Sequence, residues 1–362
     1  MEYNIETGSN FNTNAHIVIP KLRHTYNTRR SNIYLHVIYP ETKCTMSGQQ
    51  LPNIPLFLSD AQNLVQATLS AKFRLINIAE IERCRHANDP SDRFSMATAL
   101  TNASMECNRY SDIVPFDYNR VRLIKQRPNK TDYINASYVE APGKVRRYIA
   151  TQGPLDTTID DFWLMVWEQY STVIVMLTRE TEKGRNKCSK YWPDEGSLPM
   201  VFPDIGLKIG LESEELDPNT TCVVRTFRVE KFEDAHVEVR QITQLHFIGW
   251  PDQGVPDSPD NVLNLVDKTN EIQQRYIDDA NLQQSKIGPI VVHCSAGCGR
   301  TGTFCTVDST LALLPEFQPD DKSDLIYNLV GHFREQRRTM VQTLGQFQYC
   351  YLAVLSKLVT NR

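Results

Sequence analysis

A run of β-branched residues that leads into a glycine-containing loop is the feature that most constrains this fold. Residues 290–292 read Ile-Val-Val, and His293-Cys294 and a series of small residues follow as far as Gly302. Such a run is typical of a buried strand, and the residues after Gly299 have a helical pattern. A buried strand that passes directly into a helix favours an α/β fold.

The loop after this strand has the composition of an anion-binding site. Main-chain N–H groups that converge before a helix N-terminus attract anions, and Gly297 and Gly299 permit the backbone angles that convergence requires. Arg300 adds a planar guanidinium that can bind two phosphate oxygens. The same groups favour the thiolate of Cys294 over its thiol, and Thr301 can donate its hydroxyl to the sulfur. The sequence therefore predicts a phosphate loop with a nucleophilic cysteine.

The alternative interpretation is a buried cysteine in a glycine loop. The strand, the two glycines and the Thr301-Gly302 pair in front of a helix favour the functional interpretation. The sequence has no GxxxxGK[ST] motif, so nucleotide hydrolysis of that type is not supported.

Attack by a thiolate on a phosphate monoester also needs a proton donor for the leaving oxygen. Asp252 is the candidate, because it follows the bulky Trp250 in a loop rich in proline and glycine. Alone it would be interpreted as a turn residue. His293 is expected to support the loop by hydrogen bonding rather than to act as the base, with a buried structural histidine as the alternative.

Alternating strand and helix patterns predict one mixed α/β domain over 57–362, preceded by an arm over 1–56. The expected strands lie at 148–150, 173–177, 222–231, 237–247 and 289–293. The expected helices lie at 60–85, 158–170, 260–276, 299–314, 324–337 and 344–359.

Two of these elements carry an expectation about which side chains are buried. In the first helix, Leu64, Ala67 or Thr68, Ala71 and Leu75 fall at helical spacing and are expected to form the apolar face. In the strand at 237–247, the alternation of Val237 and Val239 predicts a half-exposed antiparallel strand.

Composition excludes several classes. The nine cysteines are odd in number and include no CxxC pair, so neither a disulfide framework nor a metal site is expected, and we expect no cofactor. The 39 basic and 43 acidic side chains argue against a general nucleic-acid binder. The apolar runs are far shorter than the ~20 residues that a membrane helix needs. We expect a cytoplasmic protein, with the nucleus as a second location.

The motifs together resemble the cysteine-dependent, tyrosine-specific protein phosphatases. The matching segments are His-Cys-Ser-Ala-Gly-Cys-Gly-Arg-Thr-Gly at 293–302 and Trp-Pro-Asp at 250–252, with further matches in the same order across about 57–359. This resemblance implies a central, highly twisted mixed β-sheet flanked by helices, with the phosphate loop between a strand and a helix N-terminus.

The resemblance also implies roles for individual residues. Cys294 would attack phosphorus, Asp252 would act as acid and then as base, and Gln342 would position the hydrolytic water. The catalytic set is Cys294, Arg300, Asp252, Gln342 and Thr301. The substrate-binding set is Tyr110, Asp112, Ser295, Ala296, Gly297, Cys298, Gly299 and Gln346. The supporting set is His293, Glu182, Lys187 and Trp250. In this set Glu182 would orient Arg300, and Lys187 would contact the loop that carries Asp252 (residues 250–256, the acid loop) when that loop is closed.

Two positions depart from the family pattern, and two other functions stay open. Gln253 stands where many members have an aromatic residue or histidine, which affects closure over the phenyl ring. Cys298 is interpreted either as a packing residue or as a thiol that traps oxidised Cys294.

The alternative functions are a phosphotyrosine-binding pseudophosphatase and a dual-specificity or lipid phosphatase. Tyr110 disfavours the dual-specificity or lipid phosphatase, because it implies a deep pocket.

The arm carries a second resemblance. Arg29 and Arg30 precede the apolar residues Ile33 and Leu35, as in the docking segments by which some phosphatases of this family bind MAP kinases. The alternative is a surface strand with solvated arginines.

Overall fold

The computed structural model divides the chain into two units, Met1–Gln50 and Leu51–Arg362, and all described residues belong to the second. The expected docking segment of the arm therefore lies outside the described residues. The structure describes residues 54–58, 66–125, 130–233, 236–251, 254–279, 287–318 and 323–360.

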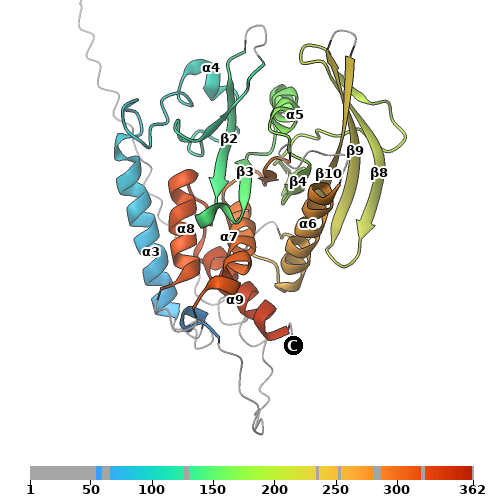
Figure 1. Ribbon diagram of the computed structural model, residues 1–362. Coiled ribbons are helices and arrows are strands. Elements are labelled where there is room, and N and C mark those ends of the chain that lie inside the picture. Colours follow the sequence, from blue (N-terminus) through green and yellow to red (C-terminus); the bar gives the residue numbers. More distant parts are fainter. Residues whose placement is uncertain are drawn as a thin grey trace, which may run out of the picture. The chain divides into compact units, whose positions relative to one another are not determined.

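A mixed nine-stranded sheet forms the centre of the described part of the chain (Figure 1). Its order is β1-β2-β3-β11-β4-β10-β9-β8-β7, in which β11 pairs in parallel with both β3 and β4. Strand β10 pairs in parallel with β4 and antiparallel with β9. The strands are β1 (Arg120–Arg122), β2 (Tyr133–Glu140), β3 (Arg147–Thr151), β4 (Val173–Met176), β7 (Met200–Phe202), β8 (Leu207–Asp217), β9 (Cys222–Glu233), β10 (His236–Phe247) and β11 (Ile290–His293), and β5 (Thr181–Glu182) pairs separately with β6 (Arg185–Asn186).

Helices cover both faces of this sheet, and two hydrophobic cores separate them. One core joins the sheet to α3, α6, α7, α8 and α9, and the other joins it to α5, which lies apart from that group (Figure 1). None of the described helices is long and apolar enough to cross a membrane. The helices are α3 (Gln66–Arg83), α4 (Asn102–Met105), α5 (Ile159–Glu168), α6 (Asp260–Asp278), α7 (Gly299–Leu313), α8 (Leu325–Gln336) and α9 (Leu344–Thr360).

Strand β4 shows why its sequence is a continuous apolar run. Val173 and Val175 belong to the core under α6 and α7, whereas Ile174 and Met176 belong to the core under α5. Successive side chains of a strand point to opposite faces, so a strand buried on both faces needs apolar residues at every position. The α/β fold class and the expected strands and helices are thus confirmed, apart from the start of the first helix, which lies outside the described residues.

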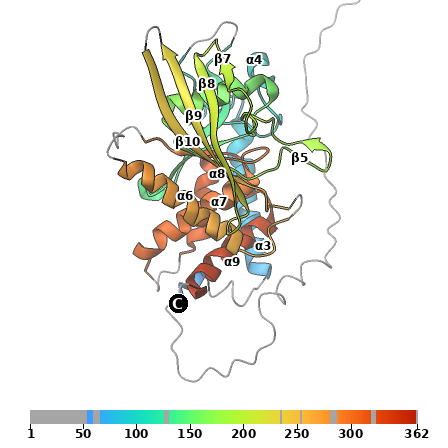
Figure 2. The ribbon, with the colours of Figure 1, turned by 90° about the vertical axis from the view of Figure 1, so that its right-hand side faces the viewer.

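The expected pattern of strand 237–247 is wrong. Its second half is buried at every position from Ile242 to Phe247, because β4 and β9 flank it and helices cover it. Its first half extends beyond β4 with β9 as a long hairpin (Figure 2). Val237 and Val239 are there 45% and 42% exposed. Burial changes along the strand rather than from residue to residue.

The expected apolar face of the first helix is also wrong. Leu75 is 55% exposed, and the residues of α3 that enter the core are Leu69, Phe73 and Ile76. Both sets have helical spacing, so periodicity could not choose between them. The face with phenylalanine buries more apolar area than the face with Ala71, and this face packs against α8 and α9.

Candidate active site

The loop between β11 and α7, residues 294–298, and the first turn of α7 approach neighbouring main chains too closely for a side chain at two positions. We call residues 294–298 the cysteine loop. A methyl group on Gly297, which has φ of 70°, would lie 2.0 Å from the carbonyl oxygen of Thr151. One on Gly302 would lie 2.2 Å from the nitrogen of Val341. Glycine is needed at both positions, and the loop lies between β3 and the segment before α9.

Cys294 begins the cysteine loop and is 5% exposed. The main-chain N–H of Gly297 donates to its sulfur at 3.3 Å. Burial alone raises the pKa of this thiol, but hydrogen bonds from the hydroxyl and main chain of Thr301, the charge of Arg300 and the N–H of Cys298 outweigh burial, so the pKa of Cys294 is lowered. The buried Thr301 hydroxyl makes no hydrogen bond of normal geometry to any described residue, so its proton is available to a thiolate at Cys294.

Other cysteines behave in the opposite way. Burial raises the pKa of Cys298 to about 12, and its side chain is 1% exposed. A thiol with this pKa stays protonated at neutral pH, which fits the packing interpretation of Cys298. Burial likewise raises the pKa of the thiols of Cys84, Cys188, Cys222, Cys305 and Cys350.

Arg300, in the first turn of α7, points toward a carboxylate rather than into solvent. Its Nη1 and Nη2 donate to the two carboxylate oxygens of Glu182 at 2.5 and 2.9 Å. The same two nitrogens also donate to the carbonyl oxygens of Leu177, at 3.0 Å, and Pro251, at 3.2 Å. The guanidinium carbon lies 6.0 Å from the centre of the Trp250 ring. The expected pairing of Glu182 with Arg300 is present in the structure.

Glu182 is itself held in place. The hydroxyl of Thr178 donates to its Oε1 at 2.9 Å, and the N–H of Arg179 donates to the same oxygen at 3.3 Å. Burial raises the pKa of this carboxyl, but the hydrogen bonds and charge of Arg300, together with the hydrogen bonds from Thr178 and Arg179, outweigh burial, so the pKa of Glu182 is lowered. Glu182 is therefore a fixed anion that orients the guanidinium.

His293 lies behind the cysteine loop and is fully buried. Its Nε2 is 2.8 Å from the hydroxyl of Tyr191, and its Nδ1 is 3.2 Å from the carbonyl oxygen of Cys294. Burial lowers its pKa to about 3, so the ring is neutral at physiological pH. A buried neutral ring with both nitrogens engaged has no contact with solvent through which to accept a substrate proton.

Tyr110 lies against the cysteine loop, where its hydroxyl is 2.8 Å from Oγ of Ser295. Ser295 donates its own proton to the carbonyl oxygen of Lys187 at 2.9 Å, so Tyr110 is the donor in the first pair. Asp112 lies two residues further on and is exposed, and its carbonyl oxygen accepts from Nη1 of Arg338 at 2.8 Å. The structure therefore places Tyr110 and Ser295 together, with the carboxylate of Asp112 at the surface.

The two expected glutamines lie at the start of α9 and next to α7. Oε1 of Gln346 accepts from the N–H of Gln342 at 2.9 Å, and Thr343 accepts from the N–H of Gln346 through Oγ1 at 3.1 Å. A methyl group on Gly299 would lie 3.0 Å from Oε1 of Gln346 and 3.2 Å from Cβ of Gln342. Both glutamines thus border the cysteine loop.

Comparison with known proteins agrees with this geometry. The family model described as protein-tyrosine phosphatase matches residues 104–356. The chain belongs to the protein-tyrosine phosphatase family. It is 38% identical over 262 residues to tyrosine-protein phosphatase non-receptor type 12 of Homo sapiens, an overlap of 72% of this chain and 31% of that protein.

Two other relatives are similar over the same part of the chain. Receptor-type tyrosine-protein phosphatase C of Homo sapiens is 39% identical over 264 residues, which are 73% of this chain and 19% of that protein. Tyrosine-protein phosphatase non-receptor type 9 of Mus musculus is 38% identical over 262 residues, which are 71% of this chain and 42% of that protein. The chain spans less than half the length of these curated phosphatases.

Two residues of the expected phosphatase site, Asp252 and Gln253, lie outside the described residues. The expected contact of Lys187 with the acid loop therefore stays a prediction. The residues that flank the pair are described, and Nε1 of Trp250 donates to the carbonyl oxygen of Gly254 at 3.3 Å. This bond joins the residue before the Pro251-Asp252-Gln253 segment to the residue after it.

Sequence reasoning missed an arginine that binds the carbonyl groups of the cysteine loop. Arg337 is fully buried, and its Nε and Nη2 donate to the carbonyl oxygens of Gly297 and Ala296 at 2.7 and 2.9 Å. It also binds Asn135 Oδ1 at 2.8 Å. These bonds occupy the carbonyl groups of Ala296 and Gly297, while the N–H of Gly297 donates to the Cys294 sulfur. The one available signal was a basic residue five positions before Gln342.

The Thr301 hydroxyl gives a test of the thiolate. We expect Thr301→Val to raise the pH at which Cys294 becomes reactive, because the variant loses a donor to the anion. A hydrogen bond to a charged group contributes about 1.5 kcal/mol, so alkylation by iodoacetamide below the midpoint should slow about tenfold. Mass spectrometry of the Cys294 peptide measures the rate across pH.

The control for this variant is Thr310→Val on the same helix. The Thr310 hydroxyl is buried and donates to the carbonyl oxygen of Thr306 at 2.7 Å, away from the sulfur. It should leave the midpoint of alkylation unchanged. Equal midpoints for Thr301→Val and the unmodified protein would contradict the account of the thiolate.

Proposed function

We propose that this chain is a phosphoric monoester hydrolase that removes phosphate from phosphotyrosine in proteins through a cysteinyl-phosphate intermediate. The observation that carries the proposal is the geometry around Cys294: it begins a strand-to-helix loop, the N–H of Gly297 donates to its sulfur, and Glu182 binds Arg300 at two points in the first turn of the helix that follows. Membership of the family and the tyrosine-phosphatase names of the relatives support it.

In the first step, the Cys294 thiolate attacks phosphorus while the bond to the tyrosyl oxygen breaks. Asp252 gives its proton to that oxygen, so tyrosine leaves neutral. The N–H groups of the cysteine loop and the guanidinium of Arg300 stabilise the charge on the three remaining phosphate oxygens. No metal is needed in this scheme, because these groups supply the positive field.

In the second step, water attacks the phosphocysteine and regenerates the thiolate. Asp252, now ionised, takes a proton from the water, and the sulfur–phosphorus bond breaks. Gln342 positions the water, and Gln346 supports it. Their place next to Gly299 supports this assignment, since the departing phosphate occupies the cysteine loop.

Substrate choice is assigned to the segment that contains Tyr110 and Asp112. The Tyr110 ring would form one wall of a pocket that only the long phosphotyrosine side chain can span, and Asp112 would bind the peptide backbone. This segment disfavours a dual-specificity phosphatase. The presence of Cys294, Arg300 and Asp252 in the sequence disfavours a pseudophosphatase.

Two substitutions test the chemistry. Cys294→Ser should abolish turnover and keep phosphotyrosyl-peptide binding. Asp252→Ala should lower kcat by about 10²–10⁴-fold with little change in KM, because acid catalysis acts in the transition state. Asp257→Ala, which removes an exposed carboxylate five residues after Asp252, is the control and should retain normal kcat. Normal turnover by Cys294→Ser would exclude this nucleophile, and an unchanged rate of Asp252→Ala would exclude this acid.

Selectivity is tested with matched phosphotyrosyl and phosphothreonyl peptides. We expect turnover of the tyrosyl peptide only, and we expect Tyr110→Ala to raise its KM about tenfold through loss of aromatic packing worth about 1.5 kcal/mol. Tyr118→Ala is the control, because that ring is 43% exposed and bonds to the carbonyl oxygen of Glu335 instead. Equal turnover of both peptides would point to the dual-specificity alternative.

We further propose that the arm docks a MAP kinase in the cytoplasm and nucleus, with Arg29 and Arg30 meeting an acidic groove and Ile33 and Leu35 filling an apolar pocket. The basic and apolar spacing in the sequence supports this. Changing both arginines to alanine should weaken kinase binding, measured by titration calorimetry, and leave turnover of a short phosphotyrosyl peptide unchanged. Undiminished binding would refute the docking proposal.

A further inference from the structure

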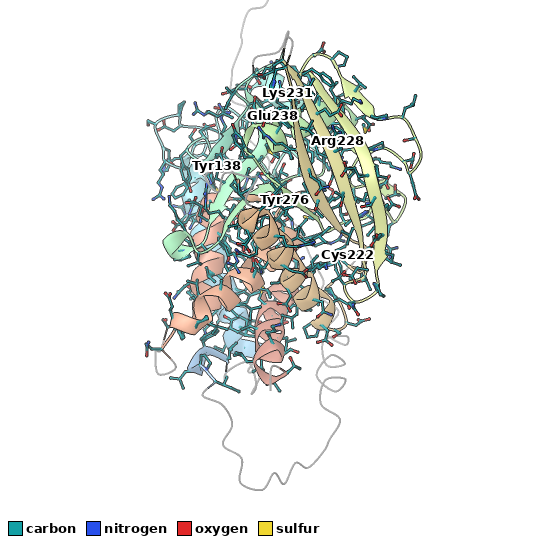
Figure 3. All side chains as sticks on the ribbon, turned by 45° about the vertical axis from the view of Figure 1, so that its right-hand side comes forward. Tyr138, Cys222, Arg228, Lys231, Glu238 and Tyr276 are labelled. Carbon is teal, nitrogen blue, oxygen red and sulfur yellow. The ribbon has the colours of Figure 1, made fainter. Side chains whose placement is uncertain are left out.

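Strand β9, the third strand from the β7 edge of the sheet, buries an arginine. Arg225 is 6% exposed, its Nε donates to Glu214 on β8 at 2.5 Å, and its guanidinium lies 4.5 Å from the centre of the Trp192 ring. Three residues further on, Arg228 makes a pair with Glu230 and is 51% exposed. Figure 3 labels Arg228 on this strand. Burying a charge is costly, so Arg225 differs from an ordinary surface arginine of the hairpin.

One hydrogen-bonded branch leads from Arg225 to the cysteine loop. A guanidinium can only donate, so Oε1 of Gln244 accepts from its Nη1 at 3.0 Å. Nε2 of Gln244 then donates to the hydroxyl oxygen of Tyr191 at 2.6 Å. Tyr191 in turn donates to Nε2 of His293 at 2.8 Å, which leaves the proton of His293 on Nδ1, 3.2 Å from the carbonyl oxygen of Cys294.

A second branch leads from the same nitrogen to Arg300. Nδ1 of His246 accepts from Nη1 of Arg225 at 3.1 Å, so the proton of His246 is on Nε2 and is donated to the carbonyl oxygen of Thr178 at 2.9 Å. The Thr178 hydroxyl donates to Oε1 of Glu182 at 2.9 Å, and Glu182 binds Arg300 at two points. Both branches thus begin at Arg225.

The direction of the bonds follows from groups that can only donate or only accept: the Arg225 guanidinium donates, whereas the carbonyl oxygens of Cys294 and Thr178 and the carboxylate of Glu182 accept. Gln244, Tyr191 and His293 are fully buried, so no solvent competes for their hydrogen bonds. Burial, with the charge of Arg225, lowers the pKa of His246 to about 4, and burial lowers that of His293 to about 3. Both rings are neutral at physiological pH and keep the tautomers that the two branches require.

We propose that Arg225 is a positioning residue for the phosphatase reaction. Its first branch, through Gln244, Tyr191 and His293, fixes the position of the Cys294 main chain. Its second branch, through His246, Thr178 and Glu182, fixes the orientation of the Arg300 guanidinium. This inference rests on the proposed function. Arg225 touches neither the substrate nor the reacting sulfur. Its effect is to fix the donors and the charge that stabilise the thiolate and the transferring phosphate.

The structure offers a closely matched control, Arg240 on the neighbouring strand β10. Its guanidinium lies 3.7 Å from the centre of the Trp167 ring, and its Nε donates to Glu238 at 2.9 Å. Its Nη1 donates to the carbonyl oxygen of Trp167 at 2.7 Å. Arg240 therefore combines a carboxylate partner and a tryptophan ring as Arg225 does, but none of its hydrogen bonds within the described residues leads toward the cysteine loop.

The experiment compares Arg225→Gln with Arg240→Gln in the full chain. Arg225→Gln should move the midpoint of Cys294 alkylation by iodoacetamide to higher pH, and should lower kcat for a phosphotyrosyl peptide about tenfold or more with little change in KM. Arg240→Gln should change neither. The titratable and charged groups of the described residues that interact with the Cys294 thiolate are Arg300, Arg337, Cys188, Cys298 and Cys305, and both variants leave them in place.

The fold of each variant is checked by its thermal unfolding. If Arg225→Gln does not fold, Gln244→Met decides the question, because it removes the first branch with a side chain of similar volume and leaves no charge unpaired. It should also move the alkylation midpoint to higher pH. The pH midpoint of Cys294 alkylation is compared between the unmodified protein and the variant that folds, Arg225→Gln or Gln244→Met. An equal midpoint would overturn the inference.

Alkylation needs no substrate, so this test separates the inference from the proposed function. Unmodified protein that turns over no phosphotyrosine would refute the proposed function, while the alkylation midpoint would still report on Arg225. Normal turnover by the unmodified protein, with an unchanged midpoint and kcat in Arg225→Gln, would refute the role of Arg225 and leave the proposed function intact.

Discussion

The rest of the site depends on one interaction, the stabilisation of negative charge at the end of β11. Burial of Cys294 opposes ionisation, and the Thr301 hydroxyl, the loop N–H groups and Arg300 together reverse that effect. These donors converge only because Gly297 and Gly302 let the loop approach neighbouring main chains more closely than any side chain would allow. The glycines, the strand-to-helix turn and the lowered pKa are therefore parts of one arrangement.

Buried charged groups hold this loop from two sides. Arg337 binds the loop carbonyls from below, whereas Glu182 holds Arg300 from the side of β4 and β5. Each of these groups is costly to bury, and none is required merely to fill a core. A loop of small residues has few side-chain contacts of its own to hold its shape. The buried charged groups keep the loop in one geometry when a phosphate binds and leaves, which explains why the free-energy cost of burying them is tolerated.

The sequence predicted the parts of this arrangement that are local. The strand, the loop and the helix at 290–313 are contiguous, so composition and periodicity identified them, and the family resemblance assigned Glu182 and Gln346. Contacts between distant strands were not predictable, because nothing in the local pattern around Arg225 or Arg337 indicates a buried partner. The burial of α3 and β10 was misjudged for the same reason: Leu75 and Phe73 have equivalent spacing, and only the packing of α8 and α9 selects between them.

The most direct test of the account is a search for phosphate covalently bound to Cys294. A radiolabelled phosphotyrosyl peptide would be mixed with the protein, quenched in acid within the first turnover, and the labelled peptide identified by mass spectrometry. The account predicts phosphocysteine at Cys294 that forms before free phosphate appears, accumulates further in Gln342→Ala, and is absent from Cys294→Ser. Release of phosphate at full rate with no label on the protein, or with the label on another residue, would contradict it.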